Sequence, residues 1–251
     1  MTERALVTGA ASGIGRATAT LLAERGAAVA CVDVNAGGLA DAVDAIAAAG
    51  GRALALTADV TDLAAVDSAV AGAVAALGGL DGVANVAGVG DFTGDVTEIT
   101  PDEWARVLAV NLTGAFHVSR ATIPHLRAAG GGAVVNVASQ FGLVGCIASP
   151  AYCASKAGLI GLTRAMAIDH TSEGIRVNCV CPGPVDTPML AWTAATPELT
   201  ARERARTQGR NLAGRSGRPE EIAATIAFMM SDEVGTMSGS IVPVDGGWTA
   251  G

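Results

Sequence analysis

Short, almost continuously apolar runs alternate with longer alanine-rich stretches along the whole chain. This alternation limits the possible folds more than any other feature of the sequence, because strands covered by helices on both faces must be apolar throughout. Seven runs have this character: ALVTG (5–9), AAVACVDV (27–34), ALALTADV (53–60), LDGVANVAG (80–88), GAVVNVAS (132–139), IRVNCVCPG (175–183) and SIVPVDGG (240–247). The pattern predicts an α/β fold, a Rossmann-type doubly wound parallel sheet of about seven strands with helices on both faces.

The stretches between these runs predict helices. Their expected bounds are 13–25, 39–49, 63–77, 101–128, 152–170 and 219–230. Pro101 and Pro219 suit a first helical turn, and the acids that follow each proline suit the positive end of the helix dipole. No repeat or linker divides the sequence, so we predict one domain over residues 1–251. A charged stretch at about 186–216 is predicted to be a substrate lid, with an ordinary surface loop as the alternative.

Charge and cysteine usage exclude several classes of function. The formal net charge of −8 argues against nucleic acid or an anionic membrane as a partner. Every apolar run is interrupted before membrane-spanning length, and the N-terminus leaves no room for a signal peptide, so we expect a soluble, cytoplasmic protein. Five cysteines without paired spacing fit reduced thiols, and three scattered histidines predict no metal site.

A glycine-rich turn, TGAASGIG at 8–15, follows the first run and opens the first helix. Glycines in such a turn let the backbone approach a pyrophosphate, and the free N–H groups at the helix start favour its negative charge. The spacing of these glycines differs from the common GxGxxG. The turn is nevertheless informative, because it follows the first predicted strand and an acid, Asp33, closes the second. The cofactor-binding residues predicted in this turn are Gly9, Ser12, Gly13, Ile14 and Gly15.

Asp33 closes the second apolar run and is followed by Val34. A carboxylate at this place can accept hydrogen bonds from both ribose hydroxyls of an adenosine, and it would repel a 2′-phosphate. The position before Gly13, where a basic residue would meet that phosphate, is Ser12. We therefore predict NAD rather than NADP as the cofactor.

The segment YCASK contains the single tyrosine of the chain, Tyr152, four positions before Lys156. Taken alone, this pair is more often a packed ring beside a solvated amine. Together with TGAASGIG, Asp59–Val60, NVAG at 85–88, Asn111, Ser139 and PGPVDTP at 182–188, however, it resembles the short-chain dehydrogenase/reductase family over essentially the whole chain. Any one of these motifs is modest evidence, whereas the ordered set is specific.

The resemblance implies a catalytic role for four residues. Tyr152 would be the general acid/base, with its phenolate favoured by the Lys156 ammonium and the positive nicotinamide. Ser139 would hydrogen-bond the substrate oxygen, and Asn111 would hold a water of a proton relay behind the lysine. The alternatives are a strand-end cap for the serine and a helix-bend hydrogen bond for the asparagine.

The resemblance also extends the predicted cofactor site. Its further members are Asp59, Val60, Asn85, Ala87, Gly88, Tyr152, Lys156, Pro182, Val185 and Thr187. In NVAG, Val86 stands where the family more often has a second asparagine (NNAG), and this puts one structural hydrogen bond in doubt. The predicted substrate pocket is an apolar lining with one amide, formed by Gln140, Phe141, Leu143, Val144, Met189 and Trp192, with Val89, Gly90, Phe92 and Leu190 as further candidates.

These residues imply an NAD-dependent enzyme that interconverts a small, mostly apolar secondary alcohol and its ketone, in a homotetramer. One alternative is a 3-ketoacyl-carrier-protein reductase that uses NADPH. Ser12 and Glu173 stand where such enzymes usually carry basic residues, although Arg127 favours that alternative. Another alternative is a nucleotide sensor without catalysis, but such proteins tend to lose the tyrosine or the lysine.

Overall fold

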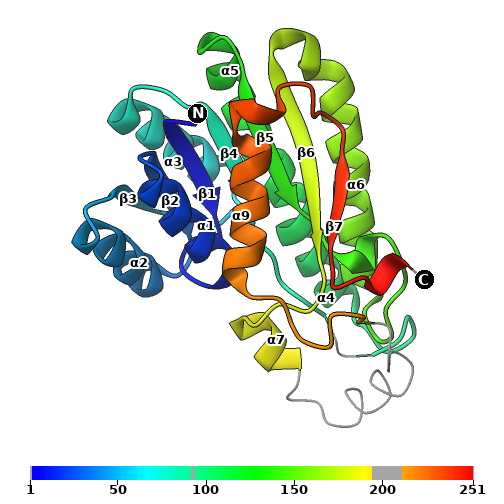
Figure 1. Cartoon of the computed structure of the whole chain (residues 1–251). Coiled ribbons are helices and arrows are strands. Elements are labelled where there is room, and N and C mark those ends of the chain that lie inside the picture. The colour runs from blue at the N-terminus through cyan, green and yellow to red at the C-terminus, as the bar shows by residue number, and fades with distance from the viewer. Residues whose placement is uncertain (1, 92–93, 194–210, 251) are drawn as a thin grey trace.

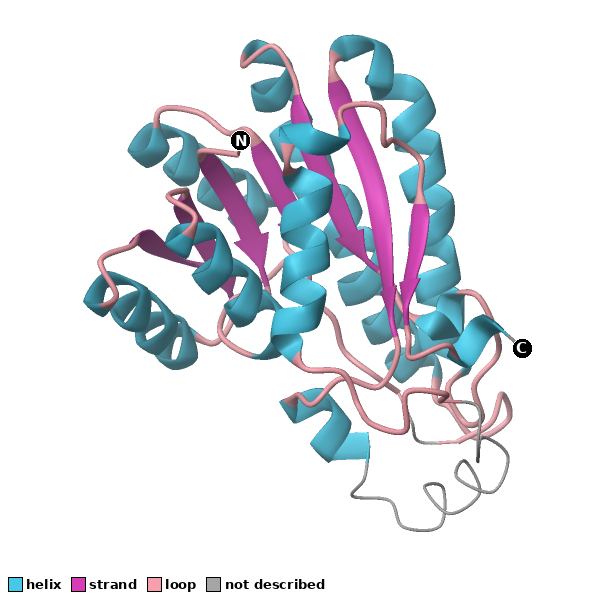
Figure 2. Cartoon of the chain, in the orientation of Figure 1, coloured by secondary structure: helices cyan, strands magenta, loops and turns pink. Residues whose placement is uncertain are grey.

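The computed structural model describes residues 2–91, 94–193 and 211–250. Its centre is a sheet of seven parallel strands in the order β3-β2-β1-β4-β5-β6-β7, and all arrowheads in Figure 2 point the same way. The strands are β1 (Arg4–Thr8), β2 (Ala28–Asp33), β3 (Arg52–Thr57), β4 (Gly82–Asn85), β5 (Gly132–Val137), β6 (Ile175–Pro182) and β7 (Ile241–Val244). The predicted fold class is confirmed.

Helices cover both faces of this sheet (Figure 1). Contacts place α1, α2 and α9 on one face and α3, α5 and α6 on the other. The helices are α1 (Gly13–Glu24), α2 (Ala36–Ala48), α3 (Leu63–Leu77), α4 (Pro101–Leu108), α5 (Gly114–Ala128), α6 (Pro150–His170), α7 (Pro188–Thr193) and α9 (Pro219–Met230). Within the described part of the chain, none of the helices has both the length and the apolar character needed to cross a membrane.

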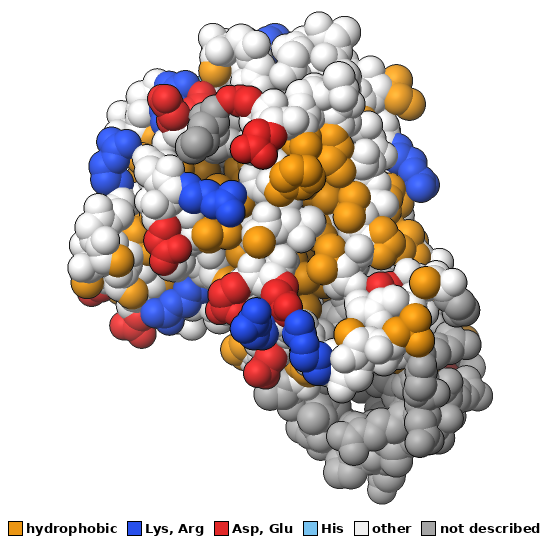
Figure 3. Space-filling model, in the orientation of Figure 1, with side chains coloured by type: hydrophobic (Ala, Val, Ile, Leu, Met, Phe, Trp, Pro, Cys, Tyr) orange, Lys and Arg blue, Asp and Glu red, His pale blue; other side chains and the backbone are white. Residues whose placement is uncertain are grey.

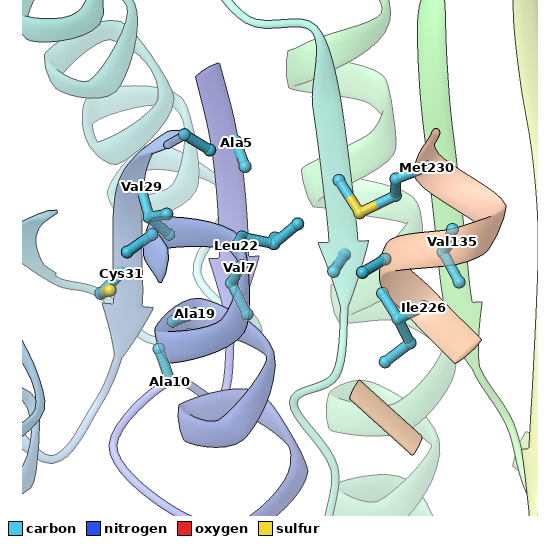
Figure 4. Packing of buried hydrophobic residues seen from close by; sticks show 14 of the residues in the cluster. Ala5, Val7, Ala10, Ala19, Leu22, Val29, Cys31, Val135, Ile226 and Met230 are labelled. Atoms are coloured by element: carbon cyan, nitrogen blue, oxygen red, sulfur yellow. The ribbon is translucent and has the colours of Figure 1, made fainter. Parts of the chain in front are cut away.

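Helices α1 and α9 pack directly on the sheet through buried side chains. Ala19 and Leu22 of α1 are buried over β1 and β2, while Ile226 and Met230 of α9 are buried over the middle strands. Figure 4 shows these side chains directed toward the sheet. Burial of each large aliphatic side chain contributes about 1.5–3 kcal/mol. The tight packing fixes the start of α1 against the end of β1, where the glycine-rich turn lies.

The strand order reverses between β1 and β4, which are direct neighbours. The connections that leave these strands lead to opposite faces, so a crevice opens beyond their carboxyl ends. In Figure 1, α7 lies beyond the carboxyl ends of the strands, on the same side as this crevice. This edge of the sheet is therefore where a ligand site is expected.

The predicted helix 101–128 is helical over its whole predicted range, but it is not α-helical throughout. A π-helical segment, Ala109–Thr113, separates α4 from α5. A π-helical turn contains one more residue than an α-helical turn and is therefore wider. Such turns occur frequently at functional sites. The segment contains Asn111, whose side chain is described below.

Candidate active site

A cavity of about 450 Å³ opens at the carboxyl ends of the strands. Its size is within the range of small-molecule sites. The structure brings most of the predicted site residues to its wall: Gly9, Ser12, Gly13, Ile14, Gly15, Asp33, Val34, Asp59, Val60, Ala87, Gly88, Val89, Ser139, Gln140, Phe141, Tyr152, Lys156, Pro182, Val185, Thr187, Met189 and Leu190. Residues from seven parts of the sequence thus share one cavity.

The glycine-rich turn forms one end of the cavity. Gly9 has a φ of +68° and Gly13 a φ of +51°, a backbone region that favours glycine. Ser12 occupies the N-cap of α1 but makes no side-chain capping hydrogen bond. The first N–H groups of the helix are therefore not capped by the Ser12 side chain, as an anion-binding helix start requires.

Thr8 ties this turn to the neighbouring strand. Its Oγ1 accepts hydrogen bonds from the backbone N–H groups of Val86 and Ala87, at 3.0 and 3.1 Å. A Cβ on Gly9 would lie 2.9 Å from the Ala87 nitrogen, so only glycine lets β1 and β4 approach this closely where they end. Both donors are backbone N–H groups, so these two hydrogen bonds form with valine at position 86 in place of the commoner asparagine.

Asp33 lies at the end of β2 and borders the cavity. Its two carboxylate oxygens accept from the N–H groups of Ala11, at 3.0 Å, and Asn35, at 2.9 Å. Each oxygen keeps a second lone pair for a further donor. Val34, 68% exposed, lies beside it as an apolar surface.

These residues fit a nicotinamide dinucleotide. Free helical N–H groups suit its pyrophosphate, the Asp33 carboxylate suits ribose hydroxyls, and apolar side chains such as Val34 and Val60 suit an adenine ring. No group of three or more His, Cys, Asp or Glu that could hold a metal ion occurs among the described residues.

Helix α6 carries the other functional end of the cavity. Tyr152 and Lys156 lie one turn apart and are both buried, with the lysine Nζ 5.6 Å from the centroid of the tyrosine ring. The Nζ donates to the carbonyl oxygen of Val137 at 2.9 Å, which anchors the ammonium to the end of β5. Ser139 lies two residues past β5 and hydrogen-bonds the Tyr152 side chain.

Burial dominates the ionisation of this pair. It raises the pKa of Tyr152 to about 12, and the hydrogen bond with Ser139 opposes part of that rise. Burial also lowers the pKa of Lys156 to about 8. We expected Lys156 to lower the pKa of Tyr152 and so favour the phenolate. In the chain without a cofactor, burial has the larger effect and raises this pKa, because burial penalises a phenolate and an ammonium alike.

Asn111 lies behind this pair rather than on the cavity wall. Its amide donates to the Val89 carbonyl oxygen at 2.9 Å and to Ser155 Oγ at 3.0 Å, and its Oδ1 accepts from the Val89 N–H at 2.8 Å. Ser155 Oγ in turn donates to the Tyr152 carbonyl oxygen at 2.8 Å. Asn111 therefore joins the loop after β4 to the helix that carries Tyr152 and Lys156.

Asp91 has a related structural role that the sequence interpretation missed. It is fully buried, and its Oδ2 accepts from the N–H groups of Ala151 and Tyr152, at 2.8 and 3.1 Å. It thus caps the start of α6, where the local N-cap, Ser149, makes no side-chain capping bond. The sequence feature that could have indicated this role is a single acidic residue in an apolar loop after the carboxyl end of β4.

Several predicted site residues lie elsewhere. Asn85 is buried within the sheet, where its amide nitrogen donates to Ser119 Oγ and Asn136 Oδ1. Gly90, Leu143 and Val144 are not on the cavity wall, and Leu143 is 39% exposed. Phe92, the Trp192 side chain and residues 194–210 of the predicted lid are outside the described residues.

The sequence also matches known proteins over nearly its whole length. A family model described as enoyl-(acyl carrier protein) reductase, one of those that represent short-chain dehydrogenases/reductases, covers residues 9–249. The chain belongs to the short-chain dehydrogenase/reductase family. As a short-chain dehydrogenase/reductase, it is an oxidoreductase of CH–OH groups that uses a nicotinamide nucleotide.

Two relatives and one solved structure illustrate this membership. The chain is 46% identical over 246 residues to cis-4-hydroxycyclohexanecarboxylate dehydrogenase of Sinomonas cyclohexanicum, with 98% of this chain and 96% of the relative covered. It is 39% identical over 246 residues to cyclohexanol dehydrogenase of Acinetobacter sp. (strain SE19), with 98% and 94% covered. The crystal structure of levodione reductase matches with a TM-score of 0.93 at 36% identity, covering 99% of this chain and 98% of that one.

Proposed function

We propose that this short-chain dehydrogenase/reductase uses NAD to interconvert a small, mostly apolar secondary alcohol and its ketone. The observation that carries the proposal is the meeting of Ser139, Tyr152 and Lys156 in one cavity with the glycine-rich turn and Asp33. Apolar residues such as Phe141, Met189 and Leu190 line the same cavity. Relatives that act on cyclohexanol and a hydroxycyclohexanecarboxylate support a cyclic alcohol as substrate.

The residues suggest how the proton is handled. In the oxidation direction Tyr152 accepts the proton of the substrate hydroxyl, while Ser139 hydrogen-bonds the same oxygen and the charge that develops on it. Lys156 supplies a positive charge behind the ring at neutral pH, and Asn111 supports the loop and helix that hold both residues. A bound nicotinamide supplies the hydride acceptor. The buried wall excludes water, which strengthens these electrostatic interactions.

The proposal is tested by following NADH absorbance with NAD and a panel of cyclic, aryl and aliphatic secondary alcohols, and then with NADP. We expect turnover of cyclic alcohols with NAD and much weaker turnover with NADP. Turnover confined to NADPH and ketoacyl thioesters would instead establish the reductase alternative. Tight NADH binding without turnover of any alcohol or ketone would point to a nucleotide sensor.

Asp33→Ala is expected to weaken NAD binding and to relax the discrimination against NADP. Loss of the charge-assisted hydrogen bonds to ribose should raise the Michaelis constant for NAD by about 10- to 100-fold. Asp33→Asn is the matched variant, because it keeps an acceptor for the Ala11 N–H but removes the charge that repels a 2′-phosphate. It should improve NADP turnover with a smaller loss for NAD. Unchanged Michaelis constants for both cofactors in both variants would contradict the role of Asp33.

The carrier-protein alternative rested on Arg127, and its surroundings disfavour that role. The Arg127 guanidinium donates to the Glu173 carboxylate at 2.8 Å, and His170 lies on the same carboxylate at 3.0 Å. An acidic carrier protein would therefore meet an arginine whose positive charge is already offset by Glu173. Ser12, at the turn, offers no charge to a 2′-phosphate either.

We further propose a cytoplasmic homotetramer. Large apolar side chains stay exposed on three helices: Phe116 on α5, Ile168 on α6 and Phe228 on α9 are 48%, 82% and 47% exposed. Figure 3 shows hydrophobic side chains gathered on the face over α9 and β7. Separate apolar faces of this kind suit contacts with more than one copy of the chain. The free state of all five cysteines suits a reducing compartment.

A further inference from the structure

Asp91 connects two parts of the site that lie far apart in the sequence. It belongs to the loop after β4 and is fully buried. Its Oδ2 accepts hydrogen bonds from the backbone N–H groups of Ala151, at 2.8 Å, and of Tyr152 itself, at 3.1 Å. The main chain of the tyrosine is thus held by a carboxylate sixty-one positions earlier in the sequence.

The loop that carries Asp91 is itself bonded to the helices around it. The N–H and carbonyl groups of Val89 both bond the Asn111 side chain, at 2.8 and 2.9 Å. The carbonyl oxygen of Gly90 accepts from the Arg106 guanidinium of α4 at 3.1 Å. Each of the two residues before Asp91 therefore has its own anchor. Asp91 holds α6 from a support that is fixed independently of α6.

The first turn of α6 depends on this carboxylate. Ser149, the N-cap residue, makes no side-chain capping hydrogen bond, and its Oγ has no partner in the described part of the chain. Tyr152 is the third residue of the helix, so its ring moves with the first turn. Catalytic groups must meet the substrate in a narrow range of geometry, and a misplacement of about 1 Å can cost about 10²-fold in rate.

The negative charge of Asp91 has a second effect. A carboxylate at a helix start is favoured by the helix dipole, whereas a like charge nearby disfavours a phenolate. Burial is the main cause of the raised pKa of Tyr152, and the charge of Asp91 acts in the same direction. The other charged or titratable groups beside these two residues are Lys156, Cys146, Cys153, Glu103 and Arg106.

We propose that Asp91 is a positioning residue of the reaction, which holds the main chain of Tyr152 from the loop after β4 and places a negative charge near its phenol. This inference rests on the proposed dehydrogenase function. The two effects can be separated by substitution. An asparagine keeps an acceptor oxygen for both N–H groups but carries no charge, whereas an alanine removes the acceptor as well.

The test compares Asp91→Ala and Asp91→Asn with the wild type, using the full chain, NAD and a cyclic alcohol that the wild type turns over. In Asp91→Ala, kcat for oxidation should fall by about 10- to 100-fold, while the dissociation constant for NADH should change much less. Asp91→Asn should restore most of this loss. In both variants the rise of oxidation with pH should move about 0.5–1 pH unit lower, because the charge that opposes the phenolate is absent.

Asp62→Ala is the matched control. Asp62 also caps a helix, since its Oδ1 accepts from the N–H groups of Ala64 and Ala65 at 2.9 and 3.1 Å, but it is not on the cavity wall. Loss of this cap should lower the thermal midpoint by about 2–4 °C and leave kcat and the pH profile unchanged.

Three results would contradict the inference. If kcat is unchanged in Asp91→Ala, the cap does not position the tyrosine. If both Asp91 variants lose kcat equally and keep the wild-type pH profile, the residue serves folding alone. If Asp91→Ala does not fold, Asp91→Asn still decides, because a rise at the wild-type pH contradicts the role of the charge. All three would leave the dehydrogenase proposal intact, whereas no turnover by the wild type with any alcohol and either cofactor would overturn that function and this inference with it.

Discussion

Tyr152→Phe is expected to lower kcat by about 10²- to 10⁴-fold, both for alcohol oxidation and for ketone reduction. The variant removes only the group that accepts or donates the proton, because a phenylalanine ring fills the same buried space. The Michaelis constant for NAD and the thermal midpoint should change little. Steady-state kinetics in both directions, together with NADH binding followed by fluorescence, separate the loss of chemistry from a loss of folding or cofactor binding.

The pH dependence of the wild type gives this prediction a second readout. Because burial raises the pKa of Tyr152 to about 12, the phenol is protonated at neutral pH in the chain by itself. Oxidation needs the phenolate, so its kcat/KM should rise with pH through the neutral and alkaline range. Reduction needs the protonated phenol and should stay nearly level up to about pH 8, above which Lys156 loses its ammonium. A bound cofactor with a positive ring would move the rise to lower pH.

Residual activity in Tyr152→Phe should lose this pH dependence. Removing the titrating group leaves the interactions of Ser139 and Lys156 with the substrate and cofactor, which do not supply a proton acceptor of the same kind. A variant that kept most of its turnover, or kept the rise of oxidation with pH, would mean that another residue handles the proton. Ser139→Ala would then be the next variant to examine.

Local patterns predicted the sheet well, and they singled out residues that the structure brings to one cavity. Apolar runs of strand length identified all seven strands, and glycines followed by the acid Asp33 located the end of the cavity that suits a nucleotide. Both signals depend on residues near one another in sequence. Parallel strands bring such signals together automatically, because their carboxyl ends meet at one edge of the sheet.

Features that depend on distant contacts were not predicted. Hydrophobic periodicity predicted helix over 101–128 but cannot show a single additional residue in one turn, so the π-helical segment around Asn111 was not foreseen. Asp91 caps a helix sixty residues away, which no local pattern indicates. Leu143 was expected in the pocket because it follows Ser139 closely. The turn at Gly142, which packs against the backbone of Lys156, directs the chain away from the cavity instead.

Gly15→Ala is expected to abolish tight cofactor binding. Gly15 is the third residue of α1 and has no unusual φ, yet an added Cβ would lie 2.1 Å from the carbonyl oxygen of Gly9. Both atoms belong to backbone, so no side chain can move aside, and the helix start must shift relative to the turn. A shifted helix start loses hydrogen bonds from its N–H groups to the pyrophosphate, each worth about 1.5–3 kcal/mol, so the dissociation constant for NADH should rise by about 10- to 100-fold for each bond lost.

Gly72→Ala is the matched control, since it is also a glycine-to-alanine change within a helix. There the nearest atom to an added Cβ is Leu56 Cδ2 at 3.5 Å, an ordinary contact, so the free energy of unfolding should rise by about 0.5–1 kcal/mol and NADH binding should be unaffected. Fluorescence titration and denaturant unfolding of the two variants separate a general helix effect from one on the turn. Equal NADH affinity in both variants would show that the start of α1 can move without loss of the site. The close packing of Gly15 against Gly9 would then be a matter of stability alone.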